Sequence, residues 1–281
     1  MPLSVAQIGQ IMEAKGNAVD HSPHYPTLAS ISEGNYTTRS LTALGKRLSH
    51  SKDDQMRVGA YAASANNGIV NDNTRIFIGS GAATYYFFLN LATIERDVEV
   101  FTNNMLIAAN YSRFHSTIKK LTVLGTGEVD RGYGHVNVKD DVLKDAVKDC
   151  GVAVVSPTLF DSDFGPSTTS ADTREARRII LQTASRVVFL ADRNKLAIYK
   201  DDVAYDYEYQ EDWSKQFEER KDRFTLITTC HLGIPAAGQE FAGRSTAAKE
   251  PGEGASYHTY CKNSFDFHSK LGDRFIELQS E

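Results

Sequence analysis

Short apolar runs alternate with longer, mixed stretches from residue 51 to residue 230. The runs are rich in Val, Ile, Leu and Phe, and hydrophobic and polar positions do not alternate within them. Continuous apolar runs of this kind are typical of strands that are buried on both faces of a sheet. We therefore expect strands within residues 74–80, 98–104, 119–127, 151–157, 186–192 and 222–230.

The stretches between these runs have helical features, such as the acidic residues at the start of residues 52–70, which suit the positive end of a helix dipole. Helices are expected within residues 52–70, 83–95, 105–115, 139–150, 173–185 and 211–222. Strands and helices that alternate in this way form a parallel sheet with helices on both faces. The predicted fold class is α/β, a three-layer sandwich built on a Rossmann-like parallel sheet.

The two ends of the chain do not follow this pattern. Four apolar residues between Val5 and Met12 have helical spacing, which predicts a short helical segment within residues 1–50. Residues 231–281 begin with a stretch dominated by Gly, Ala, Ser and Pro. That composition predicts an irregular C-terminal extension next to an α/β domain of residues 51–230.

The bulk composition narrows the class of protein. The 281 residues are 41% hydrophobic and 24% charged, which is ordinary for a globular protein, and the net charge of −5 argues against binding nucleic acid through a dominant basic surface. The sequence has no signal-peptide pattern and no apolar run of the roughly 18 residues needed to cross a bilayer. With only three cysteines, we expect a cytoplasmic protein that does not contact membranes.

Motifs for cofactors and metals are weak. Residues 79–84 are glycine-rich, but they lack the spacing and the lysine of a Walker loop and the spacing of a dinucleotide fingerprint. Two Cys/His pairs, Cys230-His231 and His258-x-x-Cys261, do not have the spacing of a zinc finger. We therefore expect neither a cofactor nor a metal.

Small polar residues and glycines follow the predicted strands at the point where each strand ends. The carboxyl ends of parallel strands meet at one rim of a sheet, where ligands of this fold class bind. Glycines and short hydroxylated side chains at such a rim expose backbone N–H groups, which favours a phosphate or a polyhydroxylated ligand. The rim residues are Gly79, Ser80, Gly81, Thr102, Asn103, Asn104, Gly125, Thr126, Gly127, Ser156, Pro157, Thr158 and Asp192.

The first of these rim segments lies between a strand and a helix. Its residues are Gly79, Ser80, Gly81, Ala82, Ala83 and Thr84. Glycines let the backbone approach a ligand, and the start of the next helix offers free N–H groups and a positive dipole end. A tight turn without a ligand explains the glycines equally well. The small polar residues at the other strand ends favour the ligand.

Two charged segments extend the predicted site. Asp172, Glu175 and Arg178 lie three residues apart, so they share one helix face. We expect Glu175 or Arg178 to face a ligand, with Thr168 and Thr169 at the rim. A solvated, ion-paired helix start is the alternative.

Asp192 ends an apolar run, and Lys195 follows it three residues later. Beside a phosphate-binding loop, this pair could bind a sugar hydroxyl and a phosphate. The alternative is an ion pair at the surface, which contributes little to stability.

The order of these motifs resembles the C-terminal sensor domain of DeoR-type sugar regulators. The resemblance covers residues 51–200 and is carried by the segments "DDQMRVGAYAASANNGIVNDNTRIFIGSGAATYYF", "VFTNNMLIAANY", "LTVLGTGEV" and "STTSADTREARRIILQTASRVVFLADRNKLA". It implies the fold shared with ribose-phosphate and glucosamine-phosphate isomerases and CoA transferases. It also implies a phosphorylated sugar or a related metabolite as the ligand.

The resemblance assigns a ligand-binding role to particular residues. By position, residues 80–84 match the phosphate loop, and the other matched residues are Asn103, Asn104, Gly125, Gly127, Thr168, Thr169, Glu175, Asp192 and Lys195. The chain departs from the family pattern at Ala82 and Ala83, where threonines are usual, and in "VSPTLFD", where an Ala-Asp-Gly segment is usual. The winged helix-turn-helix of the family cannot be recognised in residues 1–50.

Three functional hypotheses follow. The first is a sensor that binds a phosphorylated sugar or a nucleotide-like metabolite, either as a divergent DeoR-type regulator or as a free-standing sensor, and the resemblance implies a homo-oligomer. The second is a sugar-phosphate isomerase or hydrolase on the same fold, which needs a carboxylate base with a tuned pKa. Its candidates are Glu128, Asp161, Glu175 and Asp192, with His135 as a ring-opening partner. The third, DNA binding through residues 1–50, has the weakest support because the chain is acidic.

Overall fold

The computed structural model describes residues 52–64, 67, 69–71, 74–92, 97–110, 118–126, 129–130, 135–168, 171–197, 208–209, 213–229 and 253–278. The helical segment predicted within residues 1–50 lies outside these residues.

Seven strands form one parallel sheet. Their bounds are β1 (Arg75–Ile78), β2 (Glu99–Thr102), β3 (Lys120–Val123), β6 (Val152–Val155), β9 (Val187–Leu190), β11 (Phe224–Thr229) and β12 (Phe275–Leu278). The order across the sheet is β12-β11-β9-β6-β1-β2-β3, and all six neighbouring pairs are parallel. Every residue of β6, β9 and β11 is buried. Because helices cover both faces of the sheet, these strands have no solvent side and show no polar alternation.

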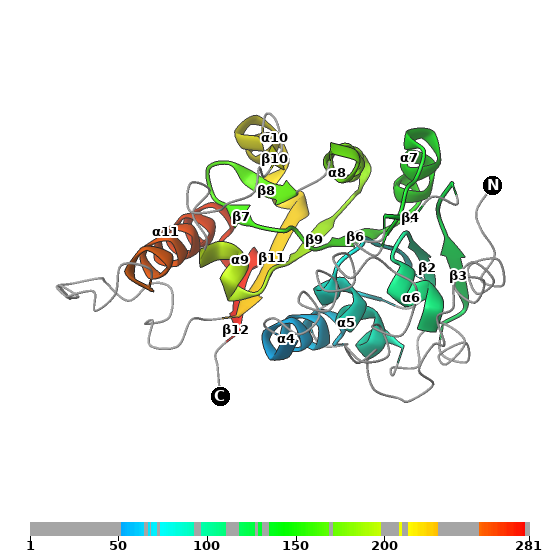
Figure 1. Cartoon of the computed structure of the whole chain (residues 1–281), viewed down its shortest axis with the longest axis horizontal. Coiled ribbons are helices and arrows are strands. Elements are labelled where there is room, and N and C mark those ends of the chain that lie inside the picture. The colour runs from blue at the N-terminus through cyan, green and yellow to red at the C-terminus, as the bar shows by residue number, and fades with distance from the viewer. Residues whose placement is uncertain are drawn as a thin grey trace.

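Helices form the two outer layers (Figure 1). Their bounds are α4 (Lys52–Ala63), α5 (Ala82–Leu91), α6 (Met105–Asn110), α7 (Asp140–Lys148), α8 (Ala171–Thr183), α9 (Arg193–Ala197), α10 (Trp213–Arg220) and α11 (Glu253–Leu271). Apolar side chains of α4, α5 and α6 share one core cluster with the sheet. Those of α7, α8, α9, α10 and α11 share a second cluster. The predicted three-layer α/β fold is confirmed.

The two cores are packed differently. Beneath α10 and α11 the core is aromatic: the Phe160 ring lies 4.7 Å from both Phe189 and Phe267, and Trp213 stacks on Phe224 at 5.7 Å between ring centroids. On the other face, α4 and α5 approach so closely that a Cβ on Gly59 would lie 2.6 Å from the backbone nitrogen of Phe87. The small residue at position 59 therefore allows the two helices to touch.

Short strands outside the main sheet were not predicted. They are β4 (Val129–Asp130), β5 (His135–Val136), β7 (Phe160–Asp161), β8 (Gly165–Thr168) and β10 (Glu208–Tyr209). The strands β7, β8 and β10 form a small antiparallel sheet, and β4 pairs with β5. Most of them have only two residues, too few for a hydrophobic period to be visible in the sequence.

The expectation of an irregular C-terminal extension is wrong for residues 253–278. These residues form the 19-residue helix α11 and the strand β12, which pairs with β11 at one edge of the main sheet. Phe267, Leu271 and Phe275 are buried in the aromatic core. The glycine-rich composition of the preceding stretch obscured this apolar spacing.

Among the described residues, no helix is both long enough and apolar enough to cross a membrane.

Candidate functional site

A cavity of about 320 Å³ opens at the carboxyl ends of β1 and β6. From β1 the chain continues to β2 and β3 on one side, whereas β6, β9, β11 and β12 lie on the other side. The boundary between β1 and β6 is therefore the topological switch point of the sheet, where ligands bind in open α/β folds. The walls come from the ends of β1, β2 and β6, from the segment linking β5 to α7, and from α8.

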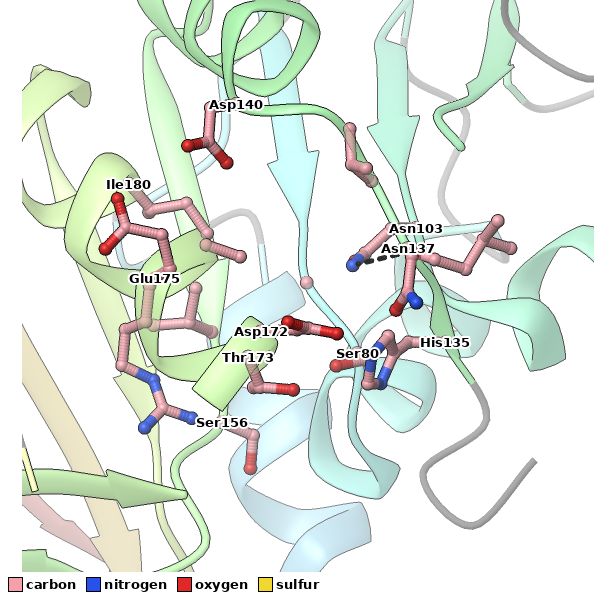
Figure 2. A pocket seen from close by; sticks show the side chains of 16 residues that line it. Ser80, Asn103, His135, Asn137, Asp140, Ser156, Asp172, Thr173, Glu175 and Ile180 are labelled. Carbon is pink, nitrogen blue, oxygen red and sulfur yellow. Dashed lines mark hydrogen bonds between the residues drawn. The ribbon is translucent and has the colours of Figure 1, made fainter. Parts of the chain in front are cut away.

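Figure 2 shows how the side chains meet in this cavity. Glu175 and Ile180 of α8 lie on one side, and Asn103, His135 and Asn137 lie on the opposite side. Ser80, which follows β1, and Ser156, which follows β6, also line the cavity. Segments that are far apart in the sequence thus place polar groups around one space.

Buried hydrogen bonds hold the loop after β1. The Thr84 hydroxyl donates to the carbonyl oxygens of Gly79 at 2.7 Å and Gly81 at 2.9 Å, and Asn104 Nδ2 donates to Gly81 O at 3.1 Å. Gly81 has φ 139°, a conformation that favours glycine. The first intrahelical bond of α5 runs from Tyr85 N to Gly81 O. The N–H groups of residues 82–84 precede that bond, so they have no acceptor within the helix, but these residues do not line the cavity.

Two neighbouring residues at the end of β2 have different roles. The Thr102 hydroxyl donates to Ile78 O at 2.6 Å and accepts a bond from Asn104 N, so it joins β2 to β1. Asn103 instead lines the cavity and is only 8% exposed. Its Nδ2 lies 3.5 Å from Val136 O, and its Oδ1 has no hydrogen-bond partner among the described residues. That buried oxygen can accept a hydrogen bond from a ligand hydroxyl.

Arg177 is the most unusual group in the cavity wall. Its side chain is buried, and Nη1 donates to the backbone oxygen of Ser167 at 2.6 Å. No carboxylate among the described residues forms an ion pair with it. Burial lowers the pKa of Arg177 to about 10, so the guanidinium stays charged at neutral pH. A buried arginine that lines a cavity, and that has no ion-pair partner in the described part of the chain, is suited to bind an anionic ligand.

A second cation lies behind Ser156. Lys195 Nζ donates to the Ser156 hydroxyl at 2.6 Å, and Ser156 lines the cavity. Lys195 belongs to the short helix α9, which follows β9. The positive charge of Lys195 therefore adds to that of Arg177 on the β6 side of the cavity.

Carboxylates also line the cavity. Asp140 and Asp172 are exposed at its walls, and Glu175 is ion-paired with Arg178. The hydrogen bond from Arg178 holds the pKa of Glu175 below its usual value. Because a general base works best when its pKa is near the operating pH, this pairing makes Glu175 a weak base. The carboxylates are better suited to accept hydrogen bonds from hydroxyl groups.

The model of the DeoR C terminal sensor domain matches residues 52–200, more than half of the chain. This chain belongs to the DeoR C-terminal sensor domain family. The match includes every element that lines the cavity and ends before α10, β11, α11 and β12.

Solved structures with a similar fold have low sequence identity to this sensor-domain protein. Ribose 5-phosphate isomerase A from Neisseria gonorrhoeae is 14% identical, with 50% of this chain and 53% of that chain covered and a TM-score of 0.34. A probable sor operon regulator from Shigella flexneri is 9% identical, with 52% and 77% covered and a TM-score of 0.35. The chain thus spans about half the length of this isomerase. No curated protein matches the sequence.

The structure divides the predicted rim residues of the sensor domain into two groups. Gly79, Ser80, Asn103 and Glu175 line the cavity, and Lys195 contacts it through Ser156. The other predicted residues that the structure describes do not line it. These are Gly81, Ala82, Ala83, Thr84, Thr102, Asn104, Gly125, Thr126, Pro157, Thr158, Thr168 and Asp192. Gly127, Glu128 and Thr169 lie outside the described residues, as do Cys230 and His231 and the side chains of His258 and Cys261.

Several of the residues that do not line the cavity have clear local roles. Ala83 belongs to the core beneath α5. A Cβ on Gly125 would lie 2.1 Å from Val136 Cγ1, so this glycine lets the segment after β3 approach β5. Thr168 is buried in β8.

Two of the candidate catalytic carboxylates also act locally. Asp161 Oδ1 accepts the N–H groups of Asp163 at 2.8 Å and Phe164 at 3.1 Å, which closes the turn between β7 and β8. Asp192 Oδ1 accepts Asn194 N at the start of α9, and its Oδ2 lies 3.4 Å from Gln55 Nε2. Both carboxylates are buried away from the cavity lining. Their contacts account for them without a ligand.

Sequence reasoning missed Arg177 and chose its neighbour Arg178. Arg178 pairs with Glu175 and Gln182 and does not line the cavity. A signal for Arg177 exists in the helical spacing, because Thr173 lies four residues before it and Ile180 three residues after it, and both line the cavity. An arginine on the same helix face as these residues points toward the cavity.

Proposed function

We propose that this DeoR-type sensor domain binds a phosphorylated monosaccharide, or a metabolite of similar size and charge, in the cavity at the switch point. The observation that carries the proposal is the buried guanidinium of Arg177, which lines this cavity without an ion-pair partner among the described residues. The phosphate would contact Arg177 and Ser80, with Lys195 close by. Membership of a sensor-domain family supports a signalling role.

The size and polarity of the cavity support a small, hydroxylated ligand. Its volume of about 320 Å³ is at the lower end of the range for small-molecule sites, about 300–1,000 Å³. This favours one phosphorylated sugar over a nucleotide. Asn103 Oδ1 and the carboxylates of Asp140 and Asp172 supply acceptors for sugar hydroxyls.

The described residues favour a sensor over an isomerase. An isomerase needs a carboxylate base beside the substrate carbons that exchange a proton. Of the predicted bases, Asp161 and Asp192 do not line the cavity, and the pairing of Glu175 with Arg178 lowers the pKa of Glu175. Asp140 and Asp172 do line the cavity, and we assign them to the hydroxyl groups of the sugar. We therefore expect the ligand to be bound and released without chemical change.

A thermal-shift screen tests this function. The panel contains ribose 5-phosphate, fructose 6-phosphate, glucosamine 6-phosphate and AMP, with each unphosphorylated counterpart as a matched control. A ligand at one hundred times its Kd adds about 2.7 kcal/mol to the free energy of unfolding, which raises the Tm by roughly 5 °C. We expect at least one sugar phosphate to do so, and NMR of the recovered compound to show it unchanged.

Two results would contradict the proposal. Equal stabilisation by a sugar and its phosphate ester would show that the cavity does not bind the phosphate group. Conversion of the bound sugar phosphate into an isomer or a hydrolysis product would show an enzyme instead of a sensor.

A further inference from the structure

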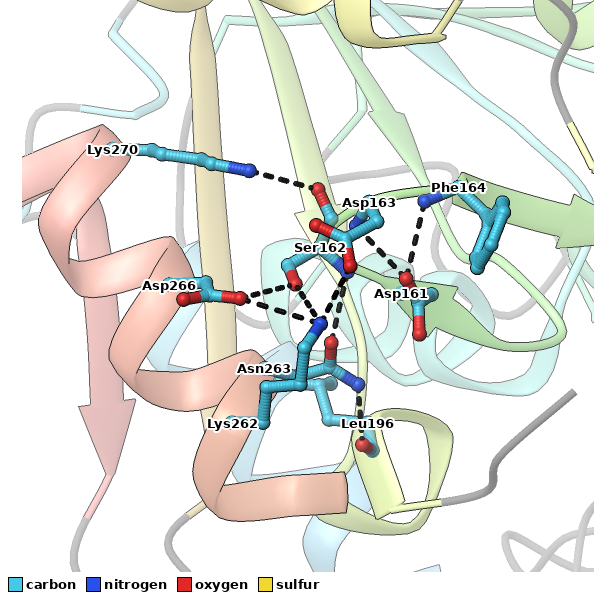
Figure 3. A network of polar contacts seen from close by, with 9 residues as sticks. All are labelled: Asp161, Ser162, Asp163, Phe164, Leu196, Lys262, Asn263, Asp266 and Lys270. Atoms are coloured by element: carbon cyan, nitrogen blue, oxygen red, sulfur yellow. Dashed lines mark hydrogen bonds and ion pairs between the residues drawn. The ribbon is translucent and has the colours of Figure 1, made fainter. Parts of the chain in front are cut away.

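The C-terminal helix α11 contacts two segments that support the cavity wall (Figure 3). One is the turn between β7 and β8, around Ser162. Lys270 Nζ donates to Ser162 O at 3.1 Å, and the Ser162 hydroxyl donates to Asp266 Oδ2 at 2.9 Å. The other segment is α9, which packs closely on α11. The family match ends before α11, so this helix is an addition to the sensor domain.

Asn263 joins these two segments to each other. It is 1% exposed, and its amide makes one hydrogen bond to each segment. Oδ1 accepts the N–H of Ser162 at 2.9 Å, and Nδ2 donates to the carbonyl oxygen of Leu196 in α9, also at 2.9 Å. Figure 3 shows this amide between the turn and α9. One side chain of α11 therefore fixes the spacing between the β7–β8 turn and α9.

Each of the joined segments supports one cation of the proposed ligand site. Ser167 in β8 provides the backbone oxygen that accepts Arg177 Nη1 at 2.6 Å. The same oxygen accepts Thr158 N at 3.0 Å, which ties the hairpin to the segment after β6. Leu196 follows Lys195, whose Nζ donates to the cavity residue Ser156 at 2.6 Å. The spacing that Asn263 fixes is thus the spacing between the supports of Arg177 and Lys195.

We propose that Asn263 is a positioning residue for the anion site, and that α11 is therefore part of the ligand-binding unit. This inference rests on the proposed function, because it assigns Asn263 to the site where Arg177 and Lys195 attract the phosphate. Asn263 touches no ligand itself. It acts by holding the β7–β8 hairpin and α9 so that the two cations converge on one anion.

The neighbouring residue Ser264 provides a matched control. It lies on the same helix and is also buried, but its hydroxyl donates to Glu277 of β12 at 3.2 Å, away from the hairpin and α9. The change Ser264→Ala removes a polar contact of α11 without touching either support of the anion site. A purely structural role of α11 predicts similar effects from Asn263→Ala and Ser264→Ala.

The test measures the Kd for inorganic phosphate by calorimetry with the full chain, at a temperature where circular dichroism shows each variant folded. We expect Asn263→Ala to weaken phosphate binding about tenfold, which is the scale for residues that act through their neighbours. Ser264→Ala should leave the Kd within about twofold of the wild type. Equal Kd values for the wild type and Asn263→Ala would overturn the inference while leaving the proposed function intact. Failure of the wild type to bind phosphate would overturn both.

A second measurement uses the wild-type protein, in case Asn263→Ala does not fold. Coupling between two sites is reciprocal, so phosphate in the cavity must also stabilise the Asn263 contacts. NMR hydrogen exchange of the Ser162 amide, which donates to Asn263, should slow severalfold when phosphate is added. An exchange rate that does not change at saturating phosphate would contradict the inference.

Discussion

The change Arg177→Met is expected to weaken sugar-phosphate binding by about 30-fold or more without destabilising the protein. Losing a charged partner of a buried ion costs about 2–5 kcal/mol of binding free energy. Methionine has similar length and suits an apolar site. Ser167 O keeps its bond from Thr158 N, so the change leaves no unpaired acceptor. Calorimetric titration and thermal unfolding of the same samples measure both effects.

Arg178→Met is the matched control for this prediction. The two arginines are adjacent in α8, but Arg178 pairs with Glu175 and Gln182 and does not line the cavity. Removing this partly exposed ion pair should change the Kd by less than about threefold and the stability by less than about 1 kcal/mol. Equal losses of affinity in the two variants would refute the role given to Arg177.

The change Gly165→Ala should cause the largest loss of stability among the substitutions considered. Gly165 has φ 81°, and a Cβ at this position would lie 2.3 Å from Trp213 Cγ. Trp213 cannot retreat, because it packs against Phe160 and Phe224 in the aromatic core. Overpacking and backbone strain together cost about 3 kcal/mol or more, which lowers the Tm by roughly 6 °C or more.

Gly272→Ala separates the effect of packing from that of backbone strain. Gly272 also has a positive φ, of 55°, but a Cβ there would meet nothing within 4 Å. We expect this variant to lose only about 1 kcal/mol. Urea unfolding of both variants decides the matter: if their losses of stability agree within about 0.5 kcal/mol, Trp213 does not restrict position 165.

Much of the sheet could be predicted because its signal is local and periodic. Strands such as Val152–Val155 and Val187–Leu190 are short apolar runs that end in small polar residues, and this pattern gives both the strand and its rim. The cavity was expected at that rim because parallel strands end on the same side. The short strands β7 and β8 were missed, since β7 has only two residues and β8, with the sequence Gly-Pro-Ser-Thr, is not an apolar run.

The individual site residues were harder to predict, because neighbours in the sequence point in different directions. Asn103 faces the cavity, whereas Asn104 holds the loop after β1. Arg177 and Arg178 differ by about 100° around the axis of α8, so one is buried and the other is not. Which of two adjacent residues faces the cavity depends on how the helix packs on the sheet, and that packing is not visible in the sequence. The contribution of Asn263 was hidden for the same reason.

A crystal structure of the full chain grown with the sugar phosphate that gives the largest thermal shift tests the central claim most directly. We expect density for the phosphate in the cavity between β1 and β6, within hydrogen-bond distance of the Arg177 guanidinium and of Ser80. The sugar hydroxyls should lie toward Asn103 Oδ1. A sugar phosphate bound elsewhere on the molecule, with no contact to Arg177, would contradict the account.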